Sequence, residues 1–428
     1  MKRNRDILIS GFALFSMFFG AGNLIFPPTL GLQMGDAWIP AMLGFLATGV
    51  GLVMLAVIAT AKTGGSIYDI GKNISRPFAI LFGTLVILSI GPGLAIPRTA
   101  ATTHEILEGA LFPGLSPLLT SIIFFGLVLF FVLSPGTMID RLGTILTPAL
   151  LFTLCIIIVK AIFSPLGVPA TLGETEVFGR SFVEGYQTMD AIAALVFTSV
   201  IIEGYRLKGI QEEHHLMKHT ISASIIASIG LSIIYGGILY MGATASGMAL
   251  GEMGRVDLLI YCSKSLLGTA GTLFMSLAMG LACLTTAIGL TATVGTFFED
   301  LFQHKIPYKV LVVISSLFSG YFAIRGVDSI VAISAPILSA LYPVAIVLIF
   351  VNLFTQHFQK RSTQIGAVLG AFLPTVFLLL SKPLGVNVME AFEEYFPLAV
   401  QSFVWIIPVI ILGFIFTFIP IPEIRKQR

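Results

Sequence analysis

Two glycines and an asparagine interrupt the first apolar stretch of the sequence, at Gly20-Ala21-Gly22-Asn23, and Pro27-Pro28 follow shortly after. Clustered glycines favour unwinding of a helix. In lipid, a helix breaks only where the released N–H and C=O groups face protein or a water-filled cavity. Such a break offers donors for an anion and carbonyl ligands for a cation, so it predicts a binding site inside the bilayer. A kink or a glycine packing face is the alternative interpretation.

A second set of candidate ligands is Ala282-Cys283-Leu284-Thr285-Thr286, in a later apolar stretch. The adjacent hydroxyls of Thr285 and Thr286, with backbone carbonyls, supply the neutral oxygens that a hard monovalent cation needs. Hydroxyls bonded to their own helix are the commoner situation. The broken first helix favours the cation site.

Charged and hydroxyl side chains mark two further apolar stretches. Arg98 follows Gly91-Pro92-Gly93 and Pro97, which prevent a regular helix, and an arginine at membrane depth is costly unless it is paired or hydrated. We expect Arg98 to line an outer gate with Asp190 or Asp328 as its partner, or else to reach the membrane surface. Phe197-Thr198-Ser199 marks an expected break in the sixth span, unless the hydroxyls bond the preceding turn of an intact helix.

These residues lie in a chain whose composition requires lipid. Of its 428 residues, 56% are hydrophobic and only 11% are charged, against about 25% charged in a soluble domain. The net charge of +2 gives no reason to expect a nucleic-acid partner. We expect one all-α polytopic domain, residues 1–428, embedded in the lipid bilayer. A span needs about 20 apolar residues, and twelve stretches qualify: 7–32, 37–61, 77–103, 117–136, 142–163, 187–205, 219–244, 266–298, 307–324, 328–354, 364–381 and 398–420.

The distribution of basic residues predicts the orientation. With the N-terminus in the cytoplasm, 17 of the 24 Lys and Arg residues lie inside. The others are Arg98, Lys160, Arg180, Arg255, Lys264, Arg325 and Lys382. Because cytoplasmic loops hold the excess of basic residues, both termini are expected in the cytoplasm. No loop is long enough for a soluble domain, and no obligatory protein partner is evident.

Together the motifs resemble a known family, the branched-chain amino acid:cation symporters (BrnQ-like). The likeness covers nearly the whole chain and is carried by Phe19 to Pro28, by Gly91 to Thr99, and by Thr188-Met189-Asp190. That family belongs to the amino acid, polyamine and organocation group, and it is similar to sodium-coupled transporters of inverted-repeat fold. The resemblance implies two inverted repeats of five spans, residues 7–163 and 187–354, followed by two C-terminal helices within 364–420. It also implies a bacterial plasma membrane location.

The resemblance further implies a cation site. In sodium-coupled relatives the ion lies between carbonyls of span one and an Ala-x-x-[Ser/Thr]-[Ser/Thr] motif of span eight. Ala282, Thr285 and Thr286 match that motif, and the carbonyls of Ser16 and Phe19 would complete the site. This chain is one residue shorter before Phe26-Pro27, which leaves the register after the break open. Proton-coupled relatives place a lysine in the middle of span five, whereas Lys160 lies near its end here, which favours Na⁺ over H⁺.

The expected activity is symport of a branched-chain L-amino acid with Na⁺ by alternating access, with no other cofactor. The amides of Ala21, Gly22 and Asn23 would hold the substrate carboxylate at the positive end of a half-helix. Carbonyls near Phe197, Thr198 and Ser199 would hold the ammonium group. Leucine, isoleucine and valine are all expected substrates, because a hydrophobic pocket distinguishes one methylene by only about 1–3 kcal/mol.

Three alternatives stay open at this stage. The same fold could carry another neutral amino acid or a nucleobase, or it could couple transport to H⁺. A protein of a different class, an amino-acid sensor without transport, would share these features. An enzyme is not expected, because the spans contain no Ser with a His and no paired carboxylates.

Overall fold

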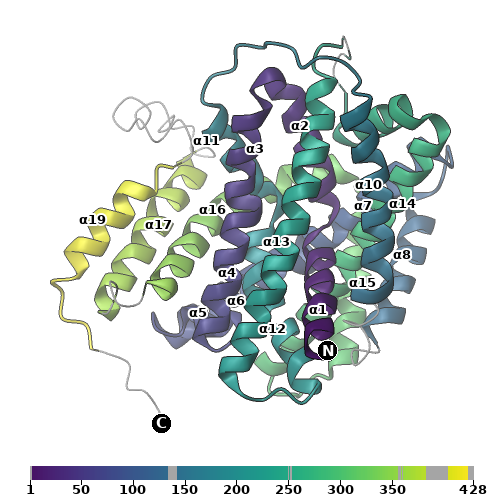
Figure 1. The fold of residues 1–428 in the computed structure, drawn as a ribbon. Helices are drawn as coiled ribbons and strands as arrows, with labels where there is room; N and C mark the ends of the chain where they lie inside the picture. The colour runs from purple at the N-terminus through teal and green to yellow at the C-terminus, as the bar shows by residue number, and fades with distance from the viewer. Residues whose placement is uncertain are drawn as a thin grey trace.

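The computed structural model describes residues 2–133, 142–248, 250, 253–354, 358, 360–381 and 403–422. These residues form helices and connecting loops, and no strand occurs among them. Most of the helices run roughly along one direction, vertical in Figure 1. Three expected features lie outside the described residues: the end of span four beyond residue 133, the start of span twelve before residue 403, and Lys382.

The described residues of the first five expected spans form α-helices joined by short 3-10 (η1) and π-helical (η2, η3, η4) segments. In chain order these are α1 (Lys2–Phe18), α2 (Ala21–Met34), η1 (Gly35–Ala37), α3 (Trp38–Leu46), η2 (Ala47–Leu52), α4 (Val53–Thr63), α5 (Ile67–Gly71), α6 (Arg76–Leu88), η3 (Ser89–Gly93), α7 (Ala95–Ala110), α8 (Pro117–Val132), η4 (Leu142–Leu146) and α10 (Thr147–Phe163).

The remaining helices follow the loop after α10. They are α11 (Val177–Glu184), η5 (Gly185–Thr188), α12 (Asp190–Leu207), α13 (Glu213–Thr244), α14 (Arg255–Leu301), α15 (Tyr308–Ala323), α16 (Val327–Leu353), α17 (Arg361–Ser381) and α19 (Ile406–Phe416). Helix α14 changes direction at Gly268, whose φ of +62° is readily adopted only by glycine.

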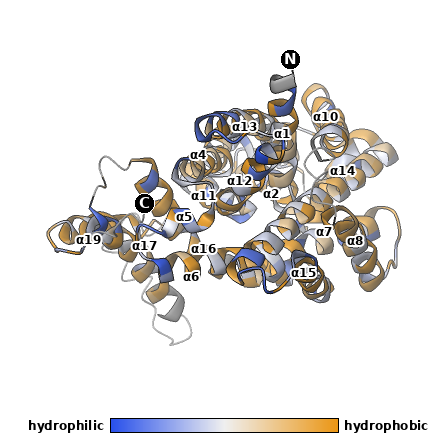
Figure 2. Cartoon of the chain, turned by 90° about the horizontal axis from the view of Figure 1, so that it is seen from below, coloured by the Kyte–Doolittle hydropathy of each residue, from blue (hydrophilic) through white to orange (hydrophobic). Residues whose placement is uncertain are grey.

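The outer surface of the helix assembly is apolar. Large side chains face outward from peripheral helices, including Phe130 on α8 (65% exposed), Phe152 on α10 (67%) and Leu317 on α15 (70%). Figure 2 shows these helices as largely hydrophobic. Continuous exposed apolar surface of this kind is stable only against lipid. The chain is therefore an all-helical, multi-pass membrane protein.

The number of spans depends on how broken helices are counted. Among the described residues, six helices are long and apolar enough to cross a membrane, or up to eight if each of two bent pairs is one span. Two more apolar helices, α8 and α19, are shorter. Every one of the twelve expected stretches has a helical counterpart, but several of these helices are too short or too broken to meet that length criterion.

The broken helices occupy the centre of the molecule. Helices α1 and α2 pack against α13 and α14, and α12 packs against α4 and α1. Asp6, near the start of α1, lies 3.5 Å from Lys208 at the end of α12, so these two ends share one face, the lower face in Figure 1. The breaks in α1/α2 and in η5/α12 therefore lie inside the assembly, where protein surrounds the released backbone groups.

Candidate functional site

The first break lies where the glycine cluster predicts it. Helix α1 ends at Phe18, Gly20 is extended (φ −112°, ψ −159°), and α2 begins at Ala21. The Gly20 N–H donates to Asn23 Oδ1 (3.1 Å), so Asn23 caps the new helix from inside its first turn. The first-turn amides of α2 have no carbonyl partner within the helix, and they lie at its positive end.

Both glycines of the break are required by close contacts. A Cβ atom at Gly20 would lie 2.9 Å from Thr286 Oγ1, and one at Gly22 would lie 2.8 Å from Arg98 Nη2. The break therefore brings α1/α2 against α14 on one side and against α7 on the other. No larger residue fits at either position without moving these side chains.

The second break lies before the position expected from the sequence. The chain turns at Met189, whose left-handed conformation (φ 68°) separates η5 from α12, and the two segments meet at 41°. The expected break at Phe197-Thr198-Ser199 is wrong, because α12 runs without interruption from Asp190 to Leu207. Thr198 and Ser199 donate to the carbonyls of Ala194 (2.6 Å) and Val196 (2.7 Å), so no freed carbonyl is available there.

The sixth span is correspondingly longer than expected. Its upper half is α11 with η5, which the predicted span starting at residue 187 leaves out. Helix α11 is only eight residues long and contains Arg180 and Glu184, so it lacks the apolar signal of a span. The start of the second repeat at residue 187 divides this bent pair, and the division into two inverted repeats stays a prediction.

A buried hydrogen-bond network joins the two breaks. Asn23 Nδ2 on α2 donates to Asp190 Oδ2 on α12 (2.6 Å), and the hydroxyl of Tyr235 on α13 donates to the same oxygen (2.7 Å). Asn23 Nδ2 also contacts the Tyr235 hydroxyl. All three side chains are buried. Because a buried carboxylate needs donors, this network fixes the two breaks relative to each other.

Arg98 closes the upper side of the same region. Its side chain is 3% exposed, which excludes a position at the membrane surface. Nη1 donates to the Gln187 carbonyl (3.1 Å), and the guanidinium lies 5.7 Å from the centre of the Phe26 ring. The expected direct ion pair is wrong, because no carboxylate oxygen of Asp190 or Asp328 lies within 4.0 Å of Arg98. Nearby on η5, the ring of Tyr186 stacks on that of Tyr342 of α16, with centres 4.4 Å apart.

The two threonines of α14 meet the end of α1. Thr285 Oγ1 lies 2.9 Å from the Ser16 carbonyl and 3.0 Å from that of Ala282. Thr286 Oγ1 lies 2.9 Å from the Met17 carbonyl and 3.3 Å from that of Ser16. Five oxygens thus converge at the negative end of α1, where the last carbonyls lack helical donors. The carbonyl of Phe19, named from the sequence, receives no hydrogen bond from either threonine, and Met17 takes that place.

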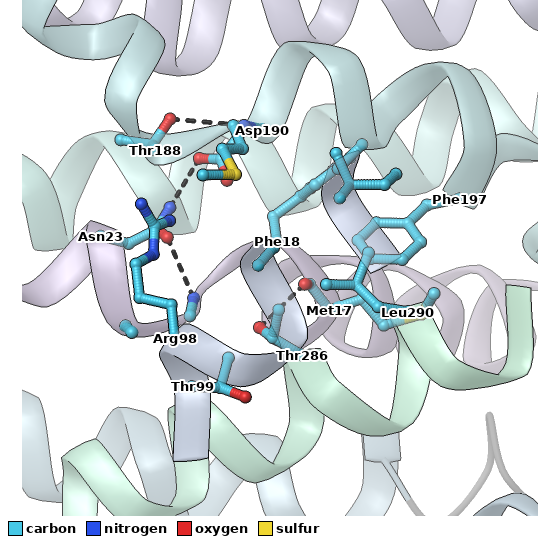
Figure 3. Close-up of a pocket in the computed structure, with 16 residues that line it drawn as sticks. Met17, Phe18, Asn23, Arg98, Thr99, Thr188, Asp190, Phe197, Thr286 and Leu290 are labelled. Carbon is cyan, nitrogen blue, oxygen red and sulfur yellow. Dashed lines mark hydrogen bonds between the residues drawn. The ribbon is translucent and has the colours of Figure 1, made fainter. Parts of the chain in front are cut away.

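A small cavity lies between these groups and has two chemically distinct ends. Arg98, Asn23, Thr188 and Asp190 gather at one end in Figure 3, while the other end is apolar. The apolar lining comprises Met17, Phe18, Ile90, Phe197 and Leu290. Thr286 lies at the boundary between the two ends (Figure 3). The cavity measures about 20 Å³, which is room for about one water molecule.

A larger cavity opens below it toward the lower face. It measures about 520 Å³ and is lined by Ser199 and Val200 of α12 and by Thr293 and Thr296 of α14, among others. Phe197 and Leu290, which line the small cavity, lie within a turn of these residues on the same helices. The small cavity is therefore separated from the larger cavity by about one helical turn, and Arg98 lies on the other side of the breaks, against Gln187 of η5 and Phe26 of α2.

The sequence-predicted residues are placed as follows. Six of them line the small cavity, namely Ala21, Asn23, Arg98, Asp190, Phe197 and Thr286. Gly22 lies next to Arg98, because a Cβ added there would be 2.8 Å from Nη2. Ser16, Ala282 and Thr285 lie beside it at the five-oxygen cluster, whereas Thr198 lines neither cavity. Lys160 is in the last turn of α10 and donates to Ser164 (3.2 Å), away from the site.

Two participants were not predicted, Tyr235 and Met17. A phenol in the middle of an apolar helix requires a hydrogen-bond partner, so Tyr235 carried a usable signal. Nothing in the sequence points to Met17, because the rotation of α1 about its axis decides which of its carbonyls faces α14.

Solved structures share this architecture. The structure of MhsT in complex with L-phenylalanine superposes with a TM-score of 0.59 at 16% identity, covering 95% of this chain and 98% of MhsT. MHP1, a nucleobase-cation-symport-1 family transporter, gives a TM-score of 0.65 at 13% identity and covers 96% and 91%. At these identities the likeness shows that this chain and the two solved proteins share one polytopic helical fold.

Sequence comparison identifies the family. The model of the branched-chain amino acid transport protein family matches residues 3–422. The branched-chain amino acid transport system 2 carrier protein of Pseudomonas aeruginosa is 37% identical over 419 residues, 94% of this chain and 93% of that protein. The branched-chain amino acid permease BraB of Bacillus subtilis is 40% identical over 379 residues, covering 86% and 84%. The chain belongs to the branched-chain amino acid transport protein family.

Proposed function

We propose that this protein imports leucine, isoleucine and valine together with Na⁺ by alternating access. The observation that carries the choice of Na⁺ is the convergence of the Thr285 and Thr286 hydroxyls on the carbonyls of Ser16 and Met17. These are neutral oxygens at the negative end of a half-helix, which is the environment that suits a monovalent cation in this fold. With the ion bound, the hydroxyls would turn their lone pairs toward it instead of donating to the carbonyls.

The substrate class follows from the family and from the shape of the small cavity. The two relatives described above are named as a carrier and a permease of branched-chain amino acids. The apolar end, with Phe18, Phe197 and Leu290, suits an aliphatic side chain, and the amides at the start of α2, where Ala21 and Asn23 line the cavity, suit a carboxylate. Such a pocket separates side chains that differ by one methylene by only about 1–3 kcal/mol, so leucine, isoleucine and valine should compete.

Alternating access is supported by the two cavities. A cavity of about 20 Å³ is too small for an amino acid, so substrate enters only when the helices around it move apart. The lower cavity of about 520 Å³ ends within one turn of the site, while on the other side Arg98 is buried against Gln187 and Phe26. We place both termini in the cytoplasm, so this conformation approaches an inward-facing state.

Coupling to one Na⁺ would make the protein an effective concentrator. Moving one positive charge through 100 mV is worth about 2.3 kcal/mol, which corresponds to roughly 50-fold accumulation of a neutral amino acid. The membrane potential thus drives uptake even without a sodium gradient.

The test is leucine uptake into proteoliposomes with the sodium gradient and the pH gradient imposed separately. A sodium gradient at equal pH should drive accumulation, and an inward proton gradient in sodium-free buffer should not. Isoleucine and valine should inhibit, with phenylalanine and uracil as controls for other substrates. Accumulation driven by the proton gradient alone would refute the choice of Na⁺, and no uptake of any branched-chain amino acid would refute the function.

A further inference from the structure

We propose that Arg98 and Asp190 together recognise the zwitterionic head group of the substrate. Arg98 binds the α-carboxylate, beside the amides of α2, and Asp190 binds the α-ammonium group. This inference rests on the proposed function and adds the groups that select an α-amino acid over other apolar molecules of the same size. It also replaces the Phe197 to Ser199 carbonyls, which α12 does not release.

Arg98 keeps unused donors inside the protein. It is 3% exposed, yet its one hydrogen bond is to the Gln187 carbonyl, and its Nε has no partner. Its other close neighbours include the Phe26 ring and Gly22, where an added Cβ would lie 2.8 Å from Nη2. A buried guanidinium without a direct counter-ion is costly, and a carboxylate with two oxygens matches its forked donors.

Asp190 keeps one oxygen available. The hydrogen bonds from Asn23 and from Tyr235 both end on Oδ2, and Thr188 lies beside the same residue. The residue is 2% exposed and lines the small cavity. The Asn23 and Tyr235 groups are neutral donors, so they orient the carboxylate without cancelling its charge. An ammonium group is the complementary ligand.

The two charges are placed as an amino acid requires. They come from different elements, α7 and α12, and their charged atoms are more than 4.0 Å apart. Figure 3 shows both at the polar end of the cavity with Asn23 beside them, opposite Phe18, Phe197 and Leu290. A zwitterion inserted there would neutralise both charges at once and direct its side chain to the apolar end.

The proposal is tested by binding with incomplete ligands. Binding of radiolabelled leucine to the purified full-length protein in Na⁺ is displaced with leucine, with 3-methylbutylamine, which lacks the carboxylate, and with 4-methylpentanoate, which lacks the ammonium group. The variants are Arg98→Gln and Asp190→Asn. Matched controls are Arg255→Gln and Asp257→Asn. Arg255 lies over the same Phe26 ring at 5.2 Å, but it and Asp257 line a different pocket, together with Glu105 and Glu108.

Each variant should lose its recognition of one group of the ligand only, the carboxylate for Arg98→Gln and the ammonium group for Asp190→Asn. Arg98→Gln should weaken leucine binding by roughly 10- to 100-fold while changing 3-methylbutylamine binding less than about threefold. Asp190→Asn should weaken leucine binding similarly while sparing 4-methylpentanoate. Arg98→Lys and Asp190→Glu keep the charges, and they should retain part of the preference for leucine over the analogue. The two control variants should keep the wild-type profile.

The outcomes separate this proposal from the function on which it rests. If the wild type binds leucine but each variant weakens all three ligands equally, the residues are structural and the proposal is overturned while the function stands. If the wild type itself binds no leucine, the proposed function fails, and the head-group assignment fails with it.

Discussion

Replacing Thr286 by valine is the most direct perturbation of the five-oxygen cluster. Valine keeps the branched shape and replaces the hydroxyl by a methyl group, which cannot bind an ion. Thr286 Oγ1 is buried between the carbonyls of Met17 (2.9 Å) and Ser16 (3.3 Å), so its loss removes one of five converging oxygens. Thr285→Val removes the neighbouring hydroxyl in the same way.

The expected loss of Na⁺ affinity depends on how much the hydroxyl stabilises the ion-bound state and the ion-free state. Losing one buried polar partner costs about 1–3 kcal/mol. Part of this is offset, because in the ion-free state the same hydroxyl donates to the α1 carbonyls, and that hydrogen bond is lost too. We therefore expect a net loss of about 1–2 kcal/mol in Na⁺ binding, or a roughly 5- to 30-fold rise in the half-saturating Na⁺ concentration.

The assay is the initial rate of leucine uptake into proteoliposomes as a function of Na⁺. At saturating Na⁺ both variants should approach the wild-type rate. Thr291→Val is the matched control, because Thr291 is on the same helix, is buried, has no hydrogen-bond partner for its hydroxyl and lines neither cavity. An unchanged Na⁺ dependence in both cluster variants, or a shift equal to that of Thr291→Val, would refute the cation site.

Three further predictions follow from the surrounding contacts. Gly22→Ala should raise the KM for leucine roughly tenfold with little change in the Na⁺ requirement, because its Cβ would lie 2.8 Å from Arg98 Nη2; uptake kinetics with each ligand varied would show this, and an unchanged KM would contradict it. Tyr235→Phe should destabilise the protein by about 1–3 kcal/mol, because it removes a donor to a buried carboxylate; a thermal unfolding midpoint equal to that of the wild type would contradict a structural role for this hydrogen bond. In a cysteine-free background, Ser199→Cys should react from the cytoplasmic side with an impermeant thiol reagent, because it lines the lower cavity, whereas Thr198→Cys should not; equal labelling of the two would contradict the position of that cavity.

Local composition was enough to predict the first break and the fold class. Glycine needs no tertiary context to interrupt a helix, so Gly20 to Asn23 identified the break, and the length of the apolar stretches identified a multi-pass membrane protein. The Thr285-Thr286 pair was found because it coincided with that break. Its carbonyl partners required the three-dimensional structure, since the rotation of α1 selects Met17 over Phe19.

The second break could not be located from composition. It depends on Met189, a non-glycine residue held at positive φ by its surroundings, and no residue type signals this conformation. The hydroxyls of Thr198 and Ser199 suggested a break but instead bond the preceding turn. The network of Asn23, Asp190 and Tyr235 joins residues from three distant segments, so only the packing of α2, α12 and α13 reveals it.

Amino acid and Na⁺ are proposed to move together. This is tested by measuring whether a gradient of the amino acid drives a flux of Na⁺. Proteoliposomes with equal Na⁺ and equal pH on both sides, and with the membrane potential clamped at zero, receive an inward gradient of leucine and a trace of ²²Na⁺. If transport is coupled, leucine entry drives net ²²Na⁺ uptake, and Thr286→Val at subsaturating Na⁺ reduces that uptake. Leucine entry without any ²²Na⁺ movement would contradict the account.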